Sequence, residues 1–249
     1  MKKNIVATAI FLLLTSSANA APVDDLNQAI SLIKSGRESE AQEILRNIIK
    51  LEATDDVKSA AYYMLAAREK DKNSALTLAT RAIDLDKTAA RNYEMKGSIL
   101  YDLKRYEESI AMLTKAIELN PIDDRLYSMR GMAFRDGGNF EKAFLDLGKA
   151  VEMSPKNGLY RMRLGKAYFL NKKYAEAIAE LERAADTIQR QDQAAECLLM
   201  VADSYFATND TAKAQQLYTA AYKYTTDQDT RKYIQTRLKS FEELKKWNY

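Results

Sequence analysis

The sequence contains no histidine, and among its 249 residues it has one cysteine, Cys197, and three prolines. Without histidine, Ser-His-Asp and Cys-His hydrolysis, histidine-containing zinc sites and histidine acid–base chemistry are excluded. A single cysteine can form neither an intramolecular disulfide nor a multi-thiolate metal site. We expect Cys197 to be a small buried residue on a helix, with an intermolecular or redox role as the alternative. The sequence therefore predicts neither a cofactor nor a metal site.

Glycine-rich phosphate loops are also missing, since Gly137-Gly138 is the only glycine pair and no phosphate-cradling motif surrounds it. Acidic pairs are common, but neighbouring residues on a helix point apart and cannot converge on a substrate. Most of these pairs fall where helices are predicted to begin, where an acid caps the helix and interacts favourably with its dipole. We therefore expect a protein that is not an enzyme. The acidic pairs are Asp24-Asp25, Asp55-Asp56, Glu107-Glu108 and Asp123-Asp124.

The first twenty residues have the three parts of a secretory signal peptide. Lys2 and Lys3 precede an apolar run over 5–14, and Ala18-Asn19-Ala20 forms an A-x-A end. The run is about half the roughly 20 residues that a membrane-spanning helix needs, so a permanent anchor is the weaker interpretation. We expect cleavage after Ala20, which places the protein in the periplasm or, alternatively, outside the cell.

Cleavage would remove two lysines and no acids, so the formal charge of +3 (38 minus 35) would become +1 (36 minus 35). A nearly neutral chain offers no general attraction for nucleic acid. We therefore expect no nucleic-acid partner, and no stable membrane insertion after cleavage.

A pattern recurs every 34 residues and is clearest between Tyr93 and Pro155. Self-similarity at this period is typical of stacked helix–turn–helix repeats, each unable to bury its apolar face alone. The recurring residues are Tyr93, Gly97, Tyr106, Leu113, Ala116 and Pro121, followed 34 positions later by Tyr127, Gly131, Phe140, Leu147, Ala150 and Pro155.

Pro121 and Pro155 set the phase, because the residue before proline avoids the helical conformation and a helix ends there. Weaker matches continue on both sides, and three extra residues fall within 187–193. The segment 229–247 has apolar residues at helical spacing and is predicted to cap the last repeat. The predicted repeats, all within a domain over 21–249, are approximately 22–55, 56–89, 90–123, 124–157, 158–194 and 195–228.

The small residues of the pattern have a packing role. Gly97, Gly131 and Gly165 lie in the middle of predicted helices, where glycine costs about 1 kcal/mol relative to alanine. A helix accepts that cost where a second helix must approach its backbone closely. The pattern therefore predicts tight helix pairs.

These residues resemble the tetratricopeptide repeat family over 22–228. The resemblance implies an all-α fold: a right-handed α-solenoid of about six helix–turn–helix repeats with a C-terminal capping helix. Some positions depart from the family pattern. Arg161 and Leu198 replace the aromatic residue near the start of a repeat, and Ala29 and Tyr63 replace the mid-helix glycine.

The resemblance also implies a concave groove, lined by the first helix of each repeat, in which partner peptides or helices bind. Six of the eight methionines beyond the signal segment fall on groove positions, and methionine suits adaptable apolar surfaces. The alternative is that these methionines pack between neighbouring first helices. Basic residues among them could hold acidic groups. The predicted groove comprises Met64, Arg91, Met95, Tyr101, Arg125, Met129, Met132, Arg135, Met162, Arg163, Lys166, Phe169 and Met200.

We expect a non-catalytic periplasmic scaffold or adaptor that binds a protein or peptide partner of a cell-envelope complex in this groove. One alternative is a holdase-like chaperone, which would protect many unrelated proteins. The other is a regulatory or catalytic subunit of an envelope hydrolase, which would need carboxylates converging in the groove. The candidates for that chemistry are Glu94, Asp102, Asp136 and Asp203.

Overall fold

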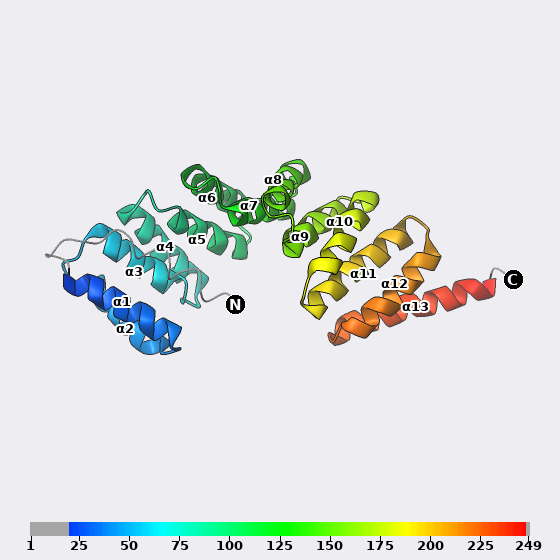
Figure 1. The fold of residues 1–249 in the computed structure, drawn as a ribbon, viewed down its shortest axis with the longest axis horizontal. Helices are drawn as coiled ribbons and strands as arrows, with labels where there is room; N and C mark the ends of the chain where they lie inside the picture. Colours follow the sequence, from blue (N-terminus) through cyan, green and yellow to red (C-terminus); the bar gives the residue numbers. More distant parts are fainter. Residues whose placement is uncertain (1–19, 248–249) are drawn as a thin grey trace. The chain divides into compact units, whose positions relative to one another are not determined.

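The computed structural model describes residues 20–247, which form thirteen α-helices and no strand (Figure 1). The chain divides into two compact units, the first ending at Pro121 and the second beginning at Ile122. The predicted signal segment lies outside the described residues, except that Ala20 is the first residue of α1. The predicted fold class, an all-α solenoid of helix–turn–helix repeats, is confirmed.

Unit 1 consists of three helix pairs, in which each helix packs against the next one along the chain. Its helices are α1 (Ala20–Lys34), α2 (Glu38–Ile48), α3 (Asp55–Ala66), α4 (Lys72–Leu85), α5 (Ala90–Asp102) and α6 (Tyr106–Leu119).

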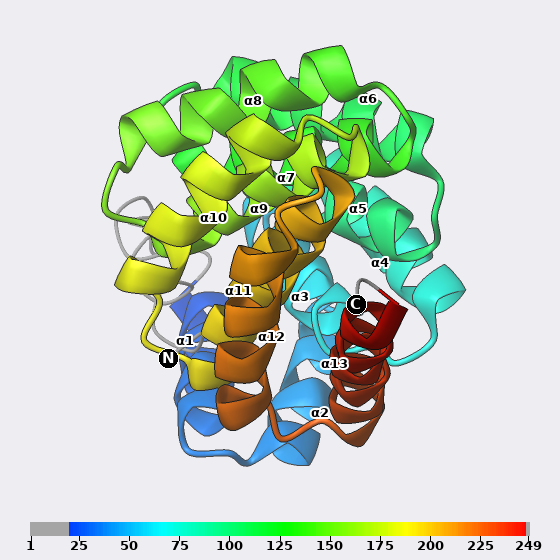
Figure 2. The same cartoon turned by 90° about the vertical axis from the view of Figure 1, so that its right-hand side faces the viewer.

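Unit 2 consists of three helix pairs and a final single helix. Its helices are α7 (Asp124–Asp136), α8 (Phe140–Met153), α9 (Gly158–Leu170), α10 (Tyr174–Thr187), α11 (Gln191–Ala207), α12 (Thr211–Tyr224) and α13 (Gln228–Trp247). α13 lies beside α12 (Figure 2). Ile234 and Phe241 of α13 are buried against Ala214, Tyr218 and Ala221 of α12.

The 34-residue period is visible in where the helices begin. The first helices α5, α7 and α9 begin at Ala90, Asp124 and Gly158, which are 34 residues apart. α11 begins at Gln191, four residues before the predicted repeat boundary at 195, and it has 17 residues where α9 has 13. The extra residues of the last repeat therefore lengthen its first helix.

Five of the six turns between paired helices have the same geometry. In each, one residue adopts a positive φ, and the next residue's N–H donates to the carbonyl five residues back, as Arg105 N does to Leu100 O at 2.9 Å. This hydrogen bond satisfies a helix-end carbonyl that would otherwise have no partner. The left-handed residues are Gly36, Lys104, Gly138, Lys172 and Asn209. The turn between α3 and α4 lacks this arrangement.

The mid-helix glycines allow the predicted close approach. A Cβ built on Gly131 would lie 2.7 Å from Leu147 Cγ on α8, and one on Gly165 would lie 2.6 Å from Leu181 Cγ on α10. Both distances are too short for any side chain unless the partner leucine moves. In the α3–α4 pair the equivalent residue is Tyr63, which is half-buried.

Cys197 is fully buried on α11, and burial raises the pKa of its thiol to about 12. The thiolate is the reactive form of cysteine, so this side chain is held in its inert state. Across the described part of the chain, none of the helices has the length and apolar character needed to cross a bilayer.

Candidate partner-binding surface

The first helices of unit 2 lie side by side, with α7 against α9 and α9 against α11. Polar side chains bridge each neighbouring pair. Arg163 Nη1 on α9 donates to Ser128 Oγ on α7 at 2.7 Å, and Lys166 Nζ on α9 lies 2.9 Å from Glu196 Oε1 on α11. Two residues predicted for the groove, both on α9, therefore reach the neighbouring first helices on either side.

The methionines divide into two groups. Met64, Met162 and Met200 are only 1%, 8% and 7% exposed, and they pack in the hydrophobic core, as the alternative interpretation held. The structure removes these three from the predicted groove lining, because helices packed on both sides cover their side chains. Met129 and Met132 of unit 2 are half-buried and remain accessible.

Phe169 is the remaining apolar residue of the predicted groove in unit 2, and Leu170 follows it at the end of α9. Phe169 is half-buried against the edge of the Tyr174 ring, with the ring centroids 6.1 Å apart, and Leu170 is 48% exposed. We refer to Met129, Met132, Phe169 and Leu170 as the apolar face of unit 2. It consists of three accessible apolar residues of the predicted groove and the exposed Leu170 beside them.

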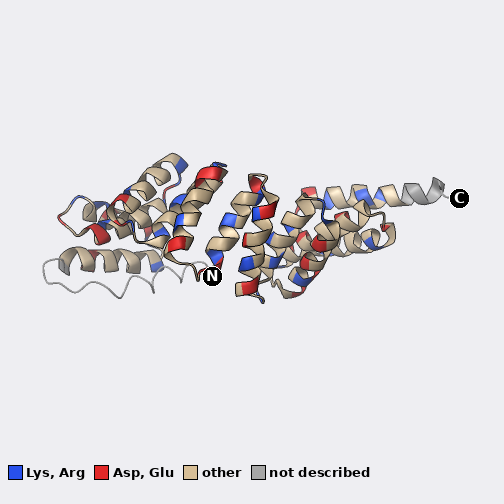
Figure 3. Cartoon of the chain, turned by 90° about the horizontal axis from the view of Figure 1, so that it is seen from above, with Lys and Arg blue, Asp and Glu red and all other residues tan. Residues whose placement is uncertain are grey.

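Most basic residues near this face already interact with acids. Arg135 is buried, and its Nε lies 2.6 Å from Asp136 Oδ1. Arg125 is exposed and its Nη2 lies 2.6 Å from Asp123 Oδ2. Charged residues of both signs are interspersed along the helices (Figure 3). Most of the basic residues predicted for the groove beside this face are therefore paired with acids. Apolar contact is the main interaction that the face can offer.

In unit 1 the remaining apolar residues predicted for the groove are Met95 and Tyr101, and both are half-buried. Tyr101 packs on Tyr106 with ring centroids 5.7 Å apart, and half-buried Met95 contacts a core cluster that includes Ile99. Arg91 is half-buried, and its Nε is buried without a hydrogen-bond partner among the described residues. Unit 1 thus presents fewer accessible apolar side chains at these positions.

Three of the four carboxylates considered for hydrolase chemistry are engaged in separate contacts. Asp102 forms an ion pair with Lys72 of α4, and Asp136 pairs with Arg135. Asp203 Oδ1 accepts hydrogen bonds from the hydroxyls of Tyr218 and Tyr233. In the part of the chain that the structure describes, no group of three or more acidic or cysteine side chains is placed to hold a metal ion.

Two side chains of α13 contact α11, the first helix of the last repeat. These contacts were not predicted from the sequence. The Arg237 guanidinium lies 4.9 Å from the ring centroid of Phe206 and 5.1 Å from that of Tyr233. Tyr233 Oη donates to Asp203 Oδ1 at 2.7 Å. The spacing of Tyr233 and Arg237, four residues apart on one helix, was the available signal. α13 therefore covers part of α11 as the first helix of another repeat would.

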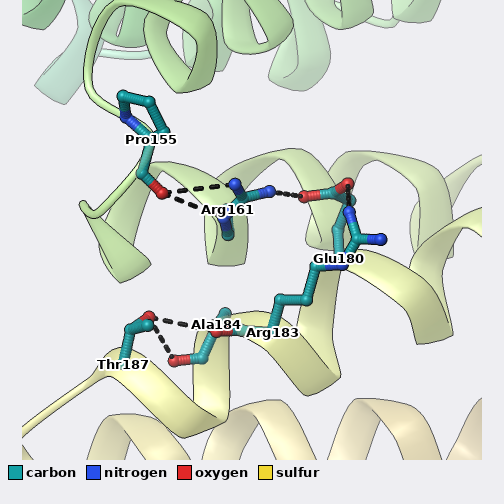
Figure 4. A network of polar contacts seen from close by, with 6 residues as sticks. All are labelled: Pro155, Arg161, Glu180, Arg183, Ala184 and Thr187. Atoms are coloured by element: carbon teal, nitrogen blue, oxygen red, sulfur yellow. Dashed lines mark hydrogen bonds and ion pairs between the residues drawn. The ribbon is translucent and has the colours of Figure 1, made fainter.

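Arg161, which replaces the family's aromatic residue, ties three segments together (Figure 4). Its Nη1 donates to Glu180 Oε2 on α10 at 2.9 Å, and its Nε and Nη2 donate to Pro155 O in the preceding turn at 3.3 and 3.2 Å. Arg183 lies on the other side of Glu180, with 3.6 Å between Nη1 and Oε1. The departure from the pattern is thus compensated by polar contacts.

Comparison with solved structures finds repeat proteins of similar fold. YrrB, described as a TPR protein with an unusual peptide-binding site, is 19% identical, with a TM-score of 0.63 over 78% of this chain and 99% of that chain. PilF of Pseudomonas aeruginosa is 17% identical, with a TM-score of 0.69 over 87% of this chain and 97% of that chain. MamA of Desulfovibrio magneticus RS-1 is 20% identical, with a TM-score of 0.62 over 68% and 96%. These likenesses show the fold.

No curated protein matches the sequence significantly. Two family models, both described as tetratricopeptide repeat, match residues 90–123 and 128–195. The first match coincides with the α5–α6 pair, and the second covers most of α7 to α10. The recurring residues, the paired helices and these two matches agree, and the segments 90–123 and 128–195 are tetratricopeptide repeats.

Proposed function

We propose that this protein is exported to the periplasm and acts as a non-catalytic scaffold that binds a peptide or helix of a cell-envelope complex. Tetratricopeptide repeats are protein–protein interaction modules and are generally non-catalytic. The proposed binding site is the apolar face of unit 2. The observation that carries it is the placement of Met129, Met132, Phe169 and Leu170, accessible apolar side chains on two neighbouring first helices.

Two further considerations support this proposal. A surface that combines flexible, polarisable methionines with an aromatic side chain suits the apolar side of a partner helix. YrrB is described as having a peptide-binding site, and by analogy a repeat array of this fold can bind a peptide. The periplasmic location is supported by the signal-peptide pattern of the first twenty residues.

The binding site can be tested by photocrosslinking in living cells. A photoreactive phenylalanine analogue at Met132 should form adducts with one or two envelope proteins. The same analogue at Leu145, which is 70% exposed on the second helix α8, is the matched control and should form few adducts. Equal labelling from both positions would contradict a binding site on this face.

A second test of the binding site uses substitution. Replacing Met129, Met132 and Phe169 together by glutamine should abolish the adducts while the helical circular dichroism signal is retained. Arg135 is left unchanged, because removing it would leave Asp136 without its ion-pair partner. If the variant folds and still captures the partner, binding on this face is wrong.

The export part of the proposal has its own test. Cell fractionation should recover the protein in the periplasm, and N-terminal sequencing should begin at Ala21. Recovery in the cytoplasm with an intact N-terminus would refute it. Capture of many unrelated unfolded proteins, together with suppression of their aggregation, would instead indicate a holdase.

A further inference from the structure

Unit 1 contains a cavity of about 370 Å³ between the second helices α2 and α4, next to the turn that follows α3. Its volume is within the range of small ligand-binding sites, about 300–1,000 Å³. Second helices contribute most of its lining, so it is separate from the first-helix positions considered above.

The cavity lies beside the irregular turn. α3 ends at Ala66, whereas the equivalent helices α5, α7 and α9 end at Asp102, Asp136 and Leu170, so α3 ends two residues early in the 34-residue period. Five residues, 67–71, connect it to α4, and none of them has a positive φ. The shortened helix is the local feature that distinguishes this pair from the others.

The turn is held by its own acidic residue. Glu69 Oε1 accepts hydrogen bonds from the backbone N–H of Lys70 at 2.9 Å and of Asp71 at 3.1 Å. These bonds satisfy amide groups that no helix supplies with partners. The Glu69 carboxylate at the edge of the cavity is therefore committed to the turn.

The floor of the cavity is apolar. Leu65 is buried, at 6% exposed, and Ile49 and Leu78 are half-buried beside it. A large aliphatic or aromatic side chain placed on this floor would remove both its own surface and theirs from water.

The lining carries one positive charge, that of Arg46, in addition to the negative charge of Glu69, whose Oε1 is held by the turn. Arg46 is exposed, and among the described residues its single interaction is a 3.4 Å hydrogen bond from Nη2 to Gln42 Oε1, with no acidic partner. The nearby Arg68, by contrast, is paired with Glu38 at 2.8 Å. A guanidinium with free N–H groups favours a carboxylate, which it can bind through two parallel hydrogen bonds.

We propose that this cavity is a docking subsite for a partner-protein segment in which a large apolar side chain stands next to an aspartate or glutamate. The apolar side chain contacts Leu65, Ile49 and Leu78, and the carboxylate accepts hydrogen bonds from Arg46. The subsite lies in unit 1 and is a second contact region, in addition to the apolar face of unit 2. The proposal does not depend on binding at that face.

A titration followed by NMR tests this directly. The ¹⁵N-labelled protein is titrated with the acetylated, amidated tetrapeptide Asp-Leu-Phe-Asp and, for comparison, with Lys-Leu-Phe-Lys. The acidic peptide should give saturable shifts at the amides of Leu65, Thr77 and Leu78. Its affinity should exceed that of the basic peptide roughly three- to tenfold, and the difference should shrink at high salt.

Two charge reversals identify the responsible residue. Arg46→Glu should reverse the preference between the two peptides. Arg81→Glu is the matched control on α4, because Arg81 is 65% exposed and does not line the cavity. It should leave the preference unchanged. Thr77→Trp, which fills the cavity from its rim, should abolish the shifts while the circular dichroism spectrum is retained.

Several outcomes would overturn the proposal. These are equal affinity for the two peptides, no saturation at millimolar concentration, and an unchanged preference in Arg46→Glu. Shifts confined to Met129, Met132 and Phe169 would support the apolar face of unit 2 and refute the cavity. Shifts of the cavity amides that depend on protein concentration without peptide would assign the cavity to a second copy of the chain.

Discussion

Asn92 in unit 1 and Tyr160 in unit 2 occupy the same repeat position, two periods of 34 residues apart, and each joins one repeat to the one before it. Asn92 Nδ2 is fully buried and donates to Ser59 Oγ at 2.9 Å and to Ala82 O at 3.0 Å. Tyr160 Oη donates to Asp124 Oδ1 at 3.1 Å, and Asp124 also accepts a hydrogen bond from the hydroxyl of Ser154.

The two joints perform one task with different chemistry. In unit 1 a neutral amide binds the last turn of α4 through the carbonyl of Ala82, which also accepts from Ser59 Oγ. In unit 2 a phenol binds a carboxylate at the start of α7. The repeat pattern therefore determines which position contacts the preceding repeat. It does not determine the residue type at that position or the hydrogen bonds that the residue forms.

The largest effect that we expect concerns a feature shared by both units. Gly131→Leu in unit 2 should lower the free energy of unfolding by about 1–3 kcal/mol or more, because the side chain would clash with Leu147. Gly97→Leu in unit 1 should behave alike, since its Cβ would lie 2.8 Å from Leu113 Cγ. Urea denaturation measures both.

Gly148→Ala is the matched control for this prediction. Gly148 is also mid-helix, but a Cβ there meets nothing within 4 Å. Alanine should therefore raise stability by about 0.5–1 kcal/mol. If Gly131→Leu were as stable as the parent, the close packing of α7 on α8 would be contradicted.

Effects of intermediate size on the free energy of unfolding should distinguish the contacts of Asn92 from those of Tyr160. Asn92→Ala removes two buried hydrogen bonds, to Ser59 and Ala82, and leaves a cavity in their place, which should cost about 1–3 kcal/mol. The comparison variant Tyr160→Phe keeps the ring and removes one hydrogen bond to a more accessible acid, so it should cost less. A larger loss in Tyr160→Phe, measured by urea denaturation, would reverse this ranking.

The smallest effect should appear at alkaline pH. Burial, and then the negative charge of Asp124, raises the pKa of Tyr160 to about 12 from an ordinary value of 10. Because the unfolded state loses this proton first, the stability that the neutral phenol contributes is fully present below pH 10. It is lost as pH rises from about 10 to 12.

Tyr160→Phe should therefore weaken the fall in stability over that range without abolishing it, since burial also raises the pKa values of Tyr168, Tyr218 and Tyr233. Asn92→Ala should leave the slope unchanged, because an amide does not titrate. Unfolding midpoints measured between about pH 8 and pH 12 test this. Identical slopes in the parent protein and Tyr160→Phe would contradict it.

The sequence was sufficient to predict the helix pairs because the signals that define them are local. Pro155 acts on the residue before it, and Gly131 packs against Leu147, sixteen residues away within the same repeat. The burial of Met64, Met162 and Met200 could not be predicted, because it depends on the volumes of side chains on neighbouring helices.

The early end of α3 and the cavity beside it were not predicted either. They arise in the repeat at 56–89, which matches the 34-residue pattern poorly. A mismatch in sequence shows that the usual helix packing is altered, but it does not show which contacts replace it. Arg161 is a similar case. The sequence shows that an aromatic is missing, and the structure shows that Glu180 and Pro155 supply the compensating contacts.

Within each unit, every helix packs only against helices one or two places away along the chain. The segments that must meet are therefore already close in sequence, and little loop-closure entropy opposes their encounter. Proteins with such local contacts fold quickly, in microseconds to milliseconds. Under the proposed export, a chain that threads through a membrane in an unfolded form would spend correspondingly little time exposed to proteases before its repeats are in place.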